Sequence, residues 1–429
     1  MLAERAVVDV SMDCDGVRSN SASAVVHLCL YLVLSMFALL ANAAGWAPAG
    51  ELLVARDGGA SMARLLSGAV LVTGGRPWAG DLRLPLATAE IYMPQSDTWH
   101  SARSMNGPRE EATATLLSNG TVLVVGGRDL TSNALASAEF YDPVSDTWTI
   151  VGNMHSSRFS HTATRLEDGR VLVSGGVDQV SYTSSAEIYD PSTKVWMSAP
   201  NMAKARKYHS ATLLPNGKVL IAGGDNSTKL GLADTELYDP VSNSWSGGAS
   251  MITGRSSHSA TALSTGKVLV VGGGNDIPPY TLNSAEIYDP LANSWTNTGS
   301  MRDERESHSA TLLLDGTVLV AGGKGITHGS FATYWSTSEL YTPSTGIWAD
   351  AGNMARPNLA PTASLLADGR VLLIGFIATP TAESYTPTAP SVVPVPALGE
   401  YELVALSLMV GASGLLLRRH RLIAGRKFV

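Results

Sequence analysis

Residues 214–224 read Leu-Pro-Asn-Gly-Lys-Val-Leu-Ile-Ala-Gly-Gly, and residues 238–245 read Tyr-Asp-Pro-Val-Ser-Asn-Ser-Trp. The first stretch predicts a β-hairpin, because the Asn216-Gly217 pair favours a tight two-residue turn and a run of apolar residues follows it. The second stretch predicts another hairpin, since aspartate followed by proline is typical of a turn. Two successive hairpins supply four antiparallel strands, so this part of the chain indicates a small four-stranded sheet.

The same unit occurs seven times along the chain. A double glycine ends its apolar strand in six copies, and a degenerate seventh copy reads Val-Leu-Leu-Ile-Gly-Phe at residues 371–376. The spacing between successive first glycines, including Gly375 of the seventh copy, stays between 48 and 53 residues, which indicates a repeat architecture. The six glycine pairs are Gly74 and Gly75, Gly126 and Gly127, Gly175 and Gly176, Gly223 and Gly224, Gly272 and Gly273, and Gly322 and Gly323.

Each copy also carries a Glu-x-Tyr element downstream of its glycines, and in six copies a tryptophan follows the tyrosine by seven residues. The repeated glutamates are Glu90, Glu139, Glu187, Glu236, Glu286, Glu339 and Glu383. The tryptophans are Trp99, Trp148, Trp196, Trp245, Trp295 and Trp348. Like five of these, Trp46 precedes an arginine by ten residues, so we expect Trp46–Val54 to be the outer strand that the seventh copy lacks.

A single four-stranded sheet cannot bury both of its faces, and packing such sheets radially around an axis solves this problem. The double glycine, the Glu-x-Tyr-Asp-Pro element and the spaced tryptophan resemble the kelch repeat, over about residues 46 to 387. The resemblance implies an all-β fold, a seven-bladed kelch-type β-propeller whose last blade is closed by the N-terminal strand Trp46–Val54. We expect one domain at residues 45–388.

The composition excludes several classes of protein. The 429 residues include 42 glycines and 21 prolines, and only 16% are charged, which excludes a disordered chain or a coiled coil. The net charge of −7 argues against a nucleic-acid partner. Both cysteines, Cys14 and Cys29, precede the repeats. The kelch resemblance extends to galactose-oxidase-type copper oxidases, whose cofactor is a tyrosine cross-linked to a cysteine, and without a cysteine in the ring we predict no such cofactor.

The N-terminal residues 1–44 resemble a leader. An apolar stretch covers residues 24–41, and Ala41-Asn42-Ala43 fits the small-x-small pattern that signal peptidase cleaves. The leader predicts export, and its alternative is an uncleaved membrane anchor.

The C-terminal residues have three parts: a Pro-rich spacer with a sorting motif at 389–402, then an apolar segment and a basic tail at 403–429. Val395 to Glu402 is similar to the IPTL/PEP-CTERM class of bacterial sorting signals, which an exosortase-type protease removes. The alternative is a plain membrane anchor. Either interpretation places the protein in the periplasm, at the cell surface or outside the cell, after a membrane-tethered stage.

Two sets of repeated polar residues have two interpretations each. The arginines could form a cationic rim that binds an acidic ligand on the loop face, or they could pair with the repeated glutamates, which we favour because buried charges need partners. These are Arg109, Arg158, Arg206, Arg255 and Arg305. Four histidines could bind a metal, but repetition favours structural hydrogen bonds, and we predict no metal site. These are His161, His209, His258 and His308.

The loops after the double glycines vary in length and content, and such loops on a rigid scaffold commonly carry binding residues. Trp78, Tyr334 and Trp335 lie in them outside the repeat pattern, as candidates for stacking on a ligand or for packing within the loop. We predict a non-catalytic binding propeller at the bacterial cell envelope, with a protein or a polysaccharide as its ligand. The alternative is a carbohydrate-active enzyme resembling kelch-type sugar epimerases.

Overall fold

The computed structural model describes residues 45–56, 58–77, 84–327, 331–376 and 380–387. They belong to the second of two units into which the chain divides, Gly45–Val429. The leader, the spacer with its sorting motif, and the apolar segment with its basic tail lie outside the described residues, so these assignments stay predictions. None of the described residues forms a helix long and apolar enough to cross a membrane.

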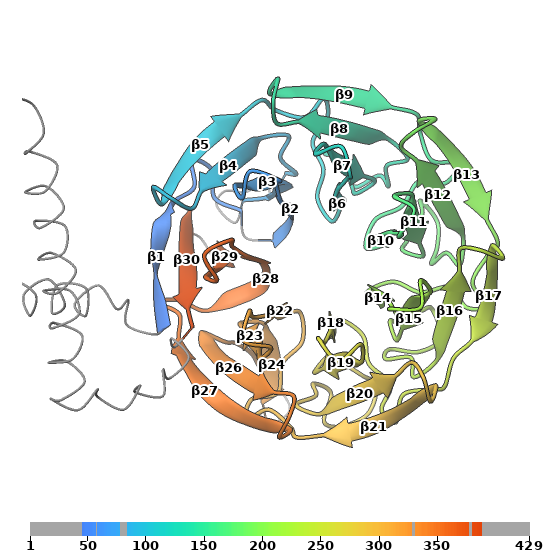
Figure 1. Cartoon of the computed structure of the whole chain (residues 1–429), viewed down its shortest axis with the longest axis vertical. Helices are drawn as coiled ribbons and strands as arrows, with labels where there is room; N and C mark the ends of the chain where they lie inside the picture. Colours follow the sequence, from blue (N-terminus) through green and yellow to red (C-terminus); the bar gives the residue numbers. More distant parts are fainter. Residues whose placement is uncertain (1–44, 57, 78–83, 328–330, 377–379, 388–429) are drawn as a thin grey trace, which may run out of the picture. The chain divides into compact units, whose positions relative to one another are not determined.

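Seven four-stranded antiparallel sheets surround a central opening (Figure 1). The first to third blades are β2 (Gly58–Arg64), β3 (Val70–Arg76), β4 (Ala89–Met93) and β5 (Thr98–Ala102); β6 (Thr113–Leu116), β7 (Val122–Val125), β8 (Ala138–Asp142) and β9 (Thr147–Val151); and β10 (Thr162–Arg165), β11 (Val171–Ser174), β12 (Ala186–Asp190) and β13 (Val195–Ala199). The fourth and fifth are β14 (Ser210–Leu213), β15 (Val219–Ala222), β16 (Thr235–Asp239) and β17 (Ser244–Gly247); and β18 (Ser259–Ala262), β19 (Val268–Val271), β20 (Ala285–Asp289) and β21 (Ser294–Thr298). The sixth is β22 (Ser309–Leu312), β23 (Val318–Ala321), β26 (Thr337–Thr342) and β27 (Ile347–Asn353), and the seventh is β28 (Asn358–Leu365), β29 (Val371–Phe376), β30 (Thr381–Thr386) and β1 (Gly45–Glu51).

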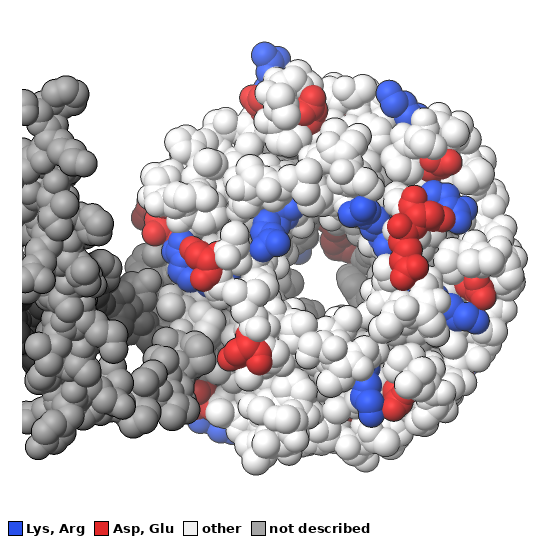
Figure 2. Space-filling model, in the orientation of Figure 1, with Lys and Arg blue, Asp and Glu red and all other residues white. Residues whose placement is uncertain are grey.

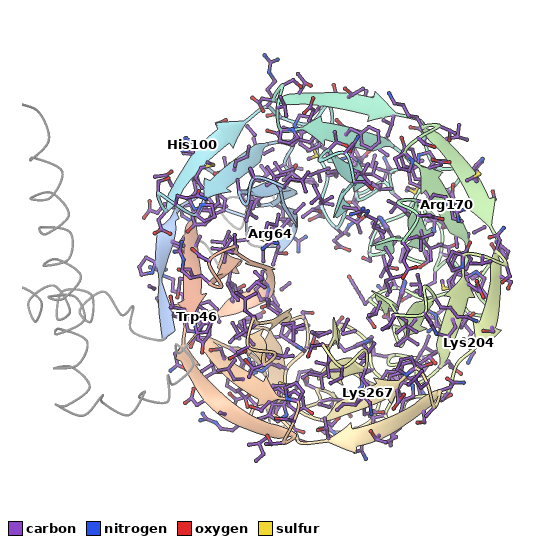
Figure 3. The ribbon with its side chains drawn as sticks, in the orientation of Figure 1. Trp46, Arg64, His100, Arg170, Lys204 and Lys267 are labelled. Atoms are coloured by element: carbon purple, nitrogen blue, oxygen red, sulfur yellow. The ribbon has the colours of Figure 1, made fainter. Side chains whose placement is uncertain are left out.

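The N-terminal strand closes the ring, as the sequence predicts. Strand β1 pairs with β30 in the seventh blade, with Trp46 opposite Tyr385 and their ring centroids 5.4 Å apart. Figure 3 labels Trp46 at this seam. The strand ends at Glu51 rather than at Val54, because the amides of Leu53 and Val54 bond instead to the carboxylate of Glu90 in the first blade.

The core lies between neighbouring blades. The second strand of each of the second to sixth blades is buried at every position, as expected for a strand covered on both faces. Leu220 of β15 shares an apolar cluster with Val268 and Val270 of β19, and each of the other blade pairs contributes to a similar cluster. The ring is therefore stabilised by seven similar interfaces rather than by one central core.

The repeated tyrosines and tryptophans join the blades. Tyr238 and Trp245 lie opposite each other on β16 and β17, with ring centroids 5.0 Å apart. The indole N–H of Trp245 donates to the carbonyl of Pro200 in the preceding blade at 2.7 Å, and Trp46 donates to Ser338 Oγ at 2.8 Å. Each outer strand is thus tied to the blade before it.

Steric contact with the next blade explains why glycine is required at the first position of the double glycine. Gly223 adopts a φ of +65°, which side chains rarely tolerate, and a Cβ there would collide with the carbonyl oxygen of Arg255. The chain that leaves β15 therefore passes close to the backbone of the next blade, and only glycine allows this approach.

The sixth blade carries an addition that the sequence analysis missed. Residues 324–337 were expected to be one of the variable loops that follow the double glycines. Within this segment β24 (Lys324–Thr327) and β25 (Phe331–Tyr334) pair as a separate two-stranded sheet, so part of its backbone hydrogen bonding is internal.

Candidate functional site

The repeated arginines lie inside the blades and not on a rim. Arg206 donates from Nη2 to Glu236 Oε1 at 2.8 Å and from Nη1 to the carbonyl of Gly223 at 2.7 Å, and its side chain is fully buried. Burial lowers its pKa from the usual value for arginine. The equivalent pairs are Arg56 with Glu90, Arg109 with Glu139, Arg158 with Glu187, Arg255 with Glu286, and Arg305 with Glu339.

This geometry corrects the assignment of Arg109, Arg158, Arg206, Arg255 and Arg305 as ligand contacts on the loop face. Their guanidinium groups are buried and bonded to carboxylates and carbonyls, so they do not present a cationic rim to solvent. The interpretation as structural pairs agrees with the structure.

The four repeated histidines link neighbouring blades. His258 Nε2 lies 2.9 Å from Ser210 Oγ, and His308 Nε2 lies 2.8 Å from Ser259 Oγ, in each case across a blade interface. His161 and His209 contact Thr113 and Thr162 in the same way. Burial lowers the pKa of His258 to about 3, so its imidazole is neutral at pH 7. The described residues hold no group of three or more His, Cys, Asp or Glu side chains placed to bind a metal ion.

The aromatic loop residues separate into three cases. Trp78 lies outside the described residues. Trp335 is partly buried, and its indole N–H donates to the carbonyl of Glu304 at 2.8 Å, so this side chain packs against the segment that precedes β22. Tyr334 on β25 is exposed.

Seven residues, one from each blade, surround the opening at the start of the innermost strands; we call this end of the opening the mouth. All seven have a left-handed backbone, with φ between +51° and +66°. They are Gly59, Glu111, Ser160, Tyr208, Ser257, Ser307 and Ala360. Backbone hydrogen bonds run between consecutive members, such as Ser307 N to Ser257 O at 2.8 Å and Ser257 N to Tyr208 O at 3.0 Å.

The mouth lies opposite the face formed by the strand-connecting hairpins. Strand β2 runs from Gly58 at the mouth to Arg64, which Figure 3 labels beside the opening. Figure 2 shows the face that carries Arg64 and Lys267, where a central opening is visible and charged side chains of both signs are scattered.

A cavity of about 470 Å³ opens at the mouth. Uncharged hydroxyl groups and charged side chains line it together. The polar lining residues are Arg76, Glu111, Tyr208, Ser257, Glu306, Ser307 and Lys324. Most of them occupy equivalent positions in different blades, yet their chemistry differs from blade to blade.

Ion pairs hold the charged side chains of the mouth. Arg128 contacts both Glu110, at 3.2 Å, and Glu111, and Arg76 lies 3.4 Å from Glu110. On the other side of the ring, Lys324 Nζ lies 3.0 Å from Glu306 Oε1. These contacts fix the directions in which the charges point.

One cation contacts two aromatic rings in the next part of the mouth. The Nζ of Lys207 lies 4.7 Å from the ring centroid of Tyr208 and 5.1 Å from that of Tyr182. Such contacts orient both groups. Asp225 pairs with Lys207 through the backbone, and burial raises the pKa of its carboxyl to about 6.

Sequence comparisons agree with the architecture. Residues 59–253 match the family model of the KLHDC2/KLHL20/DRC7 Kelch-repeats domain, and residues 255–302 match that of the Kelch motif. The protein is a kelch-type β-propeller. No curated protein matches the sequence of this propeller.

Two solved structures show the extent of the structural likeness. A fungal alcohol oxidase of the AA5 family, in complex with copper, has a TM-score of 0.66 and 20% identity, over 81% of this chain and 77% of that one. The structure of YjhT has a TM-score of 0.53 and 16% identity, over 70% of this chain and 98% of that one. At these identities the likeness establishes the fold alone.

The side chains of this propeller do not fit a copper site like that implied by the oxidase resemblance. Both cysteines lie in residues 1–44, and the repeated histidines use Nε2 to bond hydroxyl groups on neighbouring blades. We therefore derive no step through copper.

The sequence analysis missed the mouth, although a signal was present. The two residues after each repeated arginine vary, reading Glu-Glu at 110–111, Phe-Ser at 159–160, Lys-Tyr at 207–208 and Glu-Ser at 306–307. Variation at two positions of an otherwise regular repeat indicates a surface that the fold does not constrain. The sequence prediction considered only the loops after the double glycines, so it did not include these two positions.

Proposed function

We propose that this kelch propeller is a non-catalytic binding protein whose ligand docks at the mouth. One observation carries the proposal: six of the seven equivalent backbone positions line a single cavity, and they carry glycine, glutamate, tyrosine, serine or alanine in different blades. The repeated residues are used in building the ring, whereas the unrepeated residues Glu111, Tyr208 and Lys324 meet at the opening. A cavity of this size lies within the range of small-ligand and oligomer sites, about 300–1,000 Å³.

The frame around the mouth is suited to binding without rearrangement. Backbone hydrogen bonds join the mouth residues of successive blades, and ion pairs fix Arg128 and Lys324. Side chains held in place before a ligand arrives lose little conformational entropy on binding, and this favours affinity.

We extend the proposal to the cellular compartment, for which the two ends of the chain provide the support. The leader at 1–44 supports export with cleavage by signal peptidase, and residues 389–429 support a membrane-tethered stage ended by an exosortase-type protease. On this proposal the propeller acts in the bacterial envelope or outside the cell, and its ligand is an envelope protein or polysaccharide.

A second function, a carbohydrate-active enzyme, has one observation in its favour. Asp225 is buried beside Lys207, and its carboxyl has a pKa near 6, within the range in which an acid or base works at neutral pH. An Asp225→Asn variant that binds a sugar but no longer converts it would support catalysis over binding alone.

The binding proposal is tested with the full chain on a glycan array and on immobilised envelope fractions. Tyr208→Ser is the informative variant, because serine occupies the same left-handed position at 160, 257 and 307. We expect wild-type binding to fall at least about tenfold in this variant. Lys267→Gln, at the hairpin face labelled in Figure 3, is the matched control. Equal binding by wild type and Tyr208→Ser contradicts the proposal.

A further inference from the structure

We infer that the mouth binds an acidic glycan, a sugar chain that carries carboxylates. This inference rests on the proposed function and names its class of ligand.

The ion pairs of the mouth turn their cations outward. The side chain of Arg76 is 40% exposed whereas that of its partner Glu110 is 7% exposed, and Lys324 is 35% exposed against 15% for Glu306. Arg128 is 23% exposed, against 7% for Glu110 and 20% for Glu111. The formal charges nearly balance, but Arg76 and Lys324 are the more exposed members of their pairs at the cavity. A carboxylate is the complementary ligand group, since guanidinium and ammonium donors form strong charge-assisted hydrogen bonds with it.

The carboxylates behind these cations have a positioning role. Glu110 holds both Arg76 and Arg128, and Glu306 holds Lys324, so the cations are directed before a ligand arrives. A ligand carboxylate therefore adds to an existing pair and meets donors that are already ordered, which reduces the entropy lost on binding.

The remaining lining points to a sugar ring as the group that bears the carboxylate. Tyr208 is 41% exposed and is held by Lys207 against its ring, so it offers a flat aromatic surface at the cavity. Aromatic rings of this kind stack on the C–H face of sugars. The hydroxyl groups of Ser257 and Ser307 lie between Tyr208 and Lys324 around the ring, and hydroxyl donors and acceptors match sugar hydroxyls.

A peptide ligand fits this lining less well. Peptide complexes commonly derive much of their affinity from a few apolar or aromatic side chains that fill pockets. Among the described lining residues, the apolar side chains are confined to one side of the cavity, where Ala60, Leu359 and Ala360 lie. The favoured ligand is therefore the acidic sugar chain, and an acidic peptide is an outcome of the test.

The test compares ligands that differ only in the carboxylate. Isothermal titration of the full chain uses tetrasaccharides of β-1,4-mannuronate and galacturonate against their neutral counterparts of mannose and galactose. We expect at least one acidic tetrasaccharide to bind about tenfold or more tightly than its neutral counterpart, the value for one charged hydrogen bond. Raising the salt concentration should reduce this preference, because the cations are partly exposed.

Variants locate the effect. The double variant Arg76→Gln/Lys324→Gln should lose the preference for the acid while keeping weak binding of both forms. Tyr208→Ser should weaken acid and neutral forms together. Lys267→Gln, a cation paired with Asp289 on the opposite face, should change neither.

The outcomes separate the inference from the proposed function. Neutral sugars binding as tightly as acidic ones, or oligoglutamate binding at the mouth in place of any sugar, overturns the acidic-glycan inference and leaves the binding function intact. If wild type and Tyr208→Ser bind every probe and every array ligand equally, both the acidic-glycan inference and the proposed binding function are overturned.

Discussion

Replacing Arg206 with alanine should destabilise the propeller strongly. The side chain is fully buried, and it donates to Glu236 at 2.8 Å and to the carbonyls of Gly223 and Asp234 at 2.7 and 3.2 Å. Removing it leaves the Glu236 carboxylate buried without its cation and two carbonyls without donors. Breaking a buried pair from one side costs about 3–5 kcal/mol, a large part of the total stability of an ordinary domain.

The loss is not larger because Glu236 keeps other donors. The backbone amides of Ala203 and Lys204 lie 2.7 and 3.4 Å from its oxygens. A second variant uses this fact. Glu236→Gln removes the charge and keeps one oxygen, which can accept from the amide of Ala203, so Arg206→Met/Glu236→Gln should be less destabilised than Arg206→Met. The two variants share the side chain at position 206, so their difference reports the uncompensated charge, and Arg206→Ala adds the lost packing.

Urea unfolding followed by tryptophan fluorescence measures both effects, since Trp245 and its counterparts lie at the blade interfaces. The surface pair of Lys267 and Asp289, 2.9 Å apart and half-exposed, gives the control. Lys267→Ala should cost less than about 1 kcal/mol. If Arg206→Ala also unfolds within about 1 kcal/mol of wild type, the repeated arginine pairs are not the structural elements described above.

Three further predictions concern the ring itself. Deleting Trp46 to Val54 should lower the thermal midpoint and broaden the calorimetric transition, because the deletion uncovers β30 and removes the buried Ala49 and Leu52. An unchanged melting curve contradicts closure of the ring by β1. Gly223→Ala should lower the free energy of unfolding in urea by about 1–3 kcal/mol. Gly247→Ala, which has open space around its Cβ position, should stay within about 0.5 kcal/mol of wild type. Equal effects of the two substitutions refute the steric account of the double glycine. Burial lowers the pKa of His258 to about 3, so below about pH 6.5 the unfolded chain binds a proton that the native ring does not. The free energy of unfolding should therefore fall as the pH drops from 7 toward 4, and it should fall less steeply in His258→Gln. Parallel slopes for the two proteins refute this account.

The repeat made the fold predictable from sequence alone. Seven copies of one pattern fix the number of blades, and the offset between Trp46 and Arg56 locates the strand that closes them. The pairing of Arg206 with Glu236 also follows from the pattern, because a charge repeated inside apolar strands requires a partner. These inferences succeed because each depends on residues that every blade shares.

The candidate site was harder to predict because it depends on residues that the blades do not share. Glu111, Tyr208 and Lys324 are distant in sequence, and only closure of the ring brings them to one cavity. Their relative exposure depends on which side chains occupy the two ends of a backbone bridge that recurs between blades, such as Glu306 with Lys324, and these side chains are not part of the repeated pattern. The hairpin β24–β25 escaped prediction for a similar reason, since no other blade has an equivalent pair of strands among the described residues.

The seam between β1 and β30 has a mechanical consequence. The register places Gly45, where β1 begins, opposite Thr386, where β30 ends. A force applied to these two residues therefore pulls on the same end of an antiparallel pair, and the hydrogen bonds between the strands break one after another instead of sharing the load. The other blades carry no such tension, because their strands follow one another along the chain. Under traction the ring opens at the seventh blade first, however well the same seam resists heat.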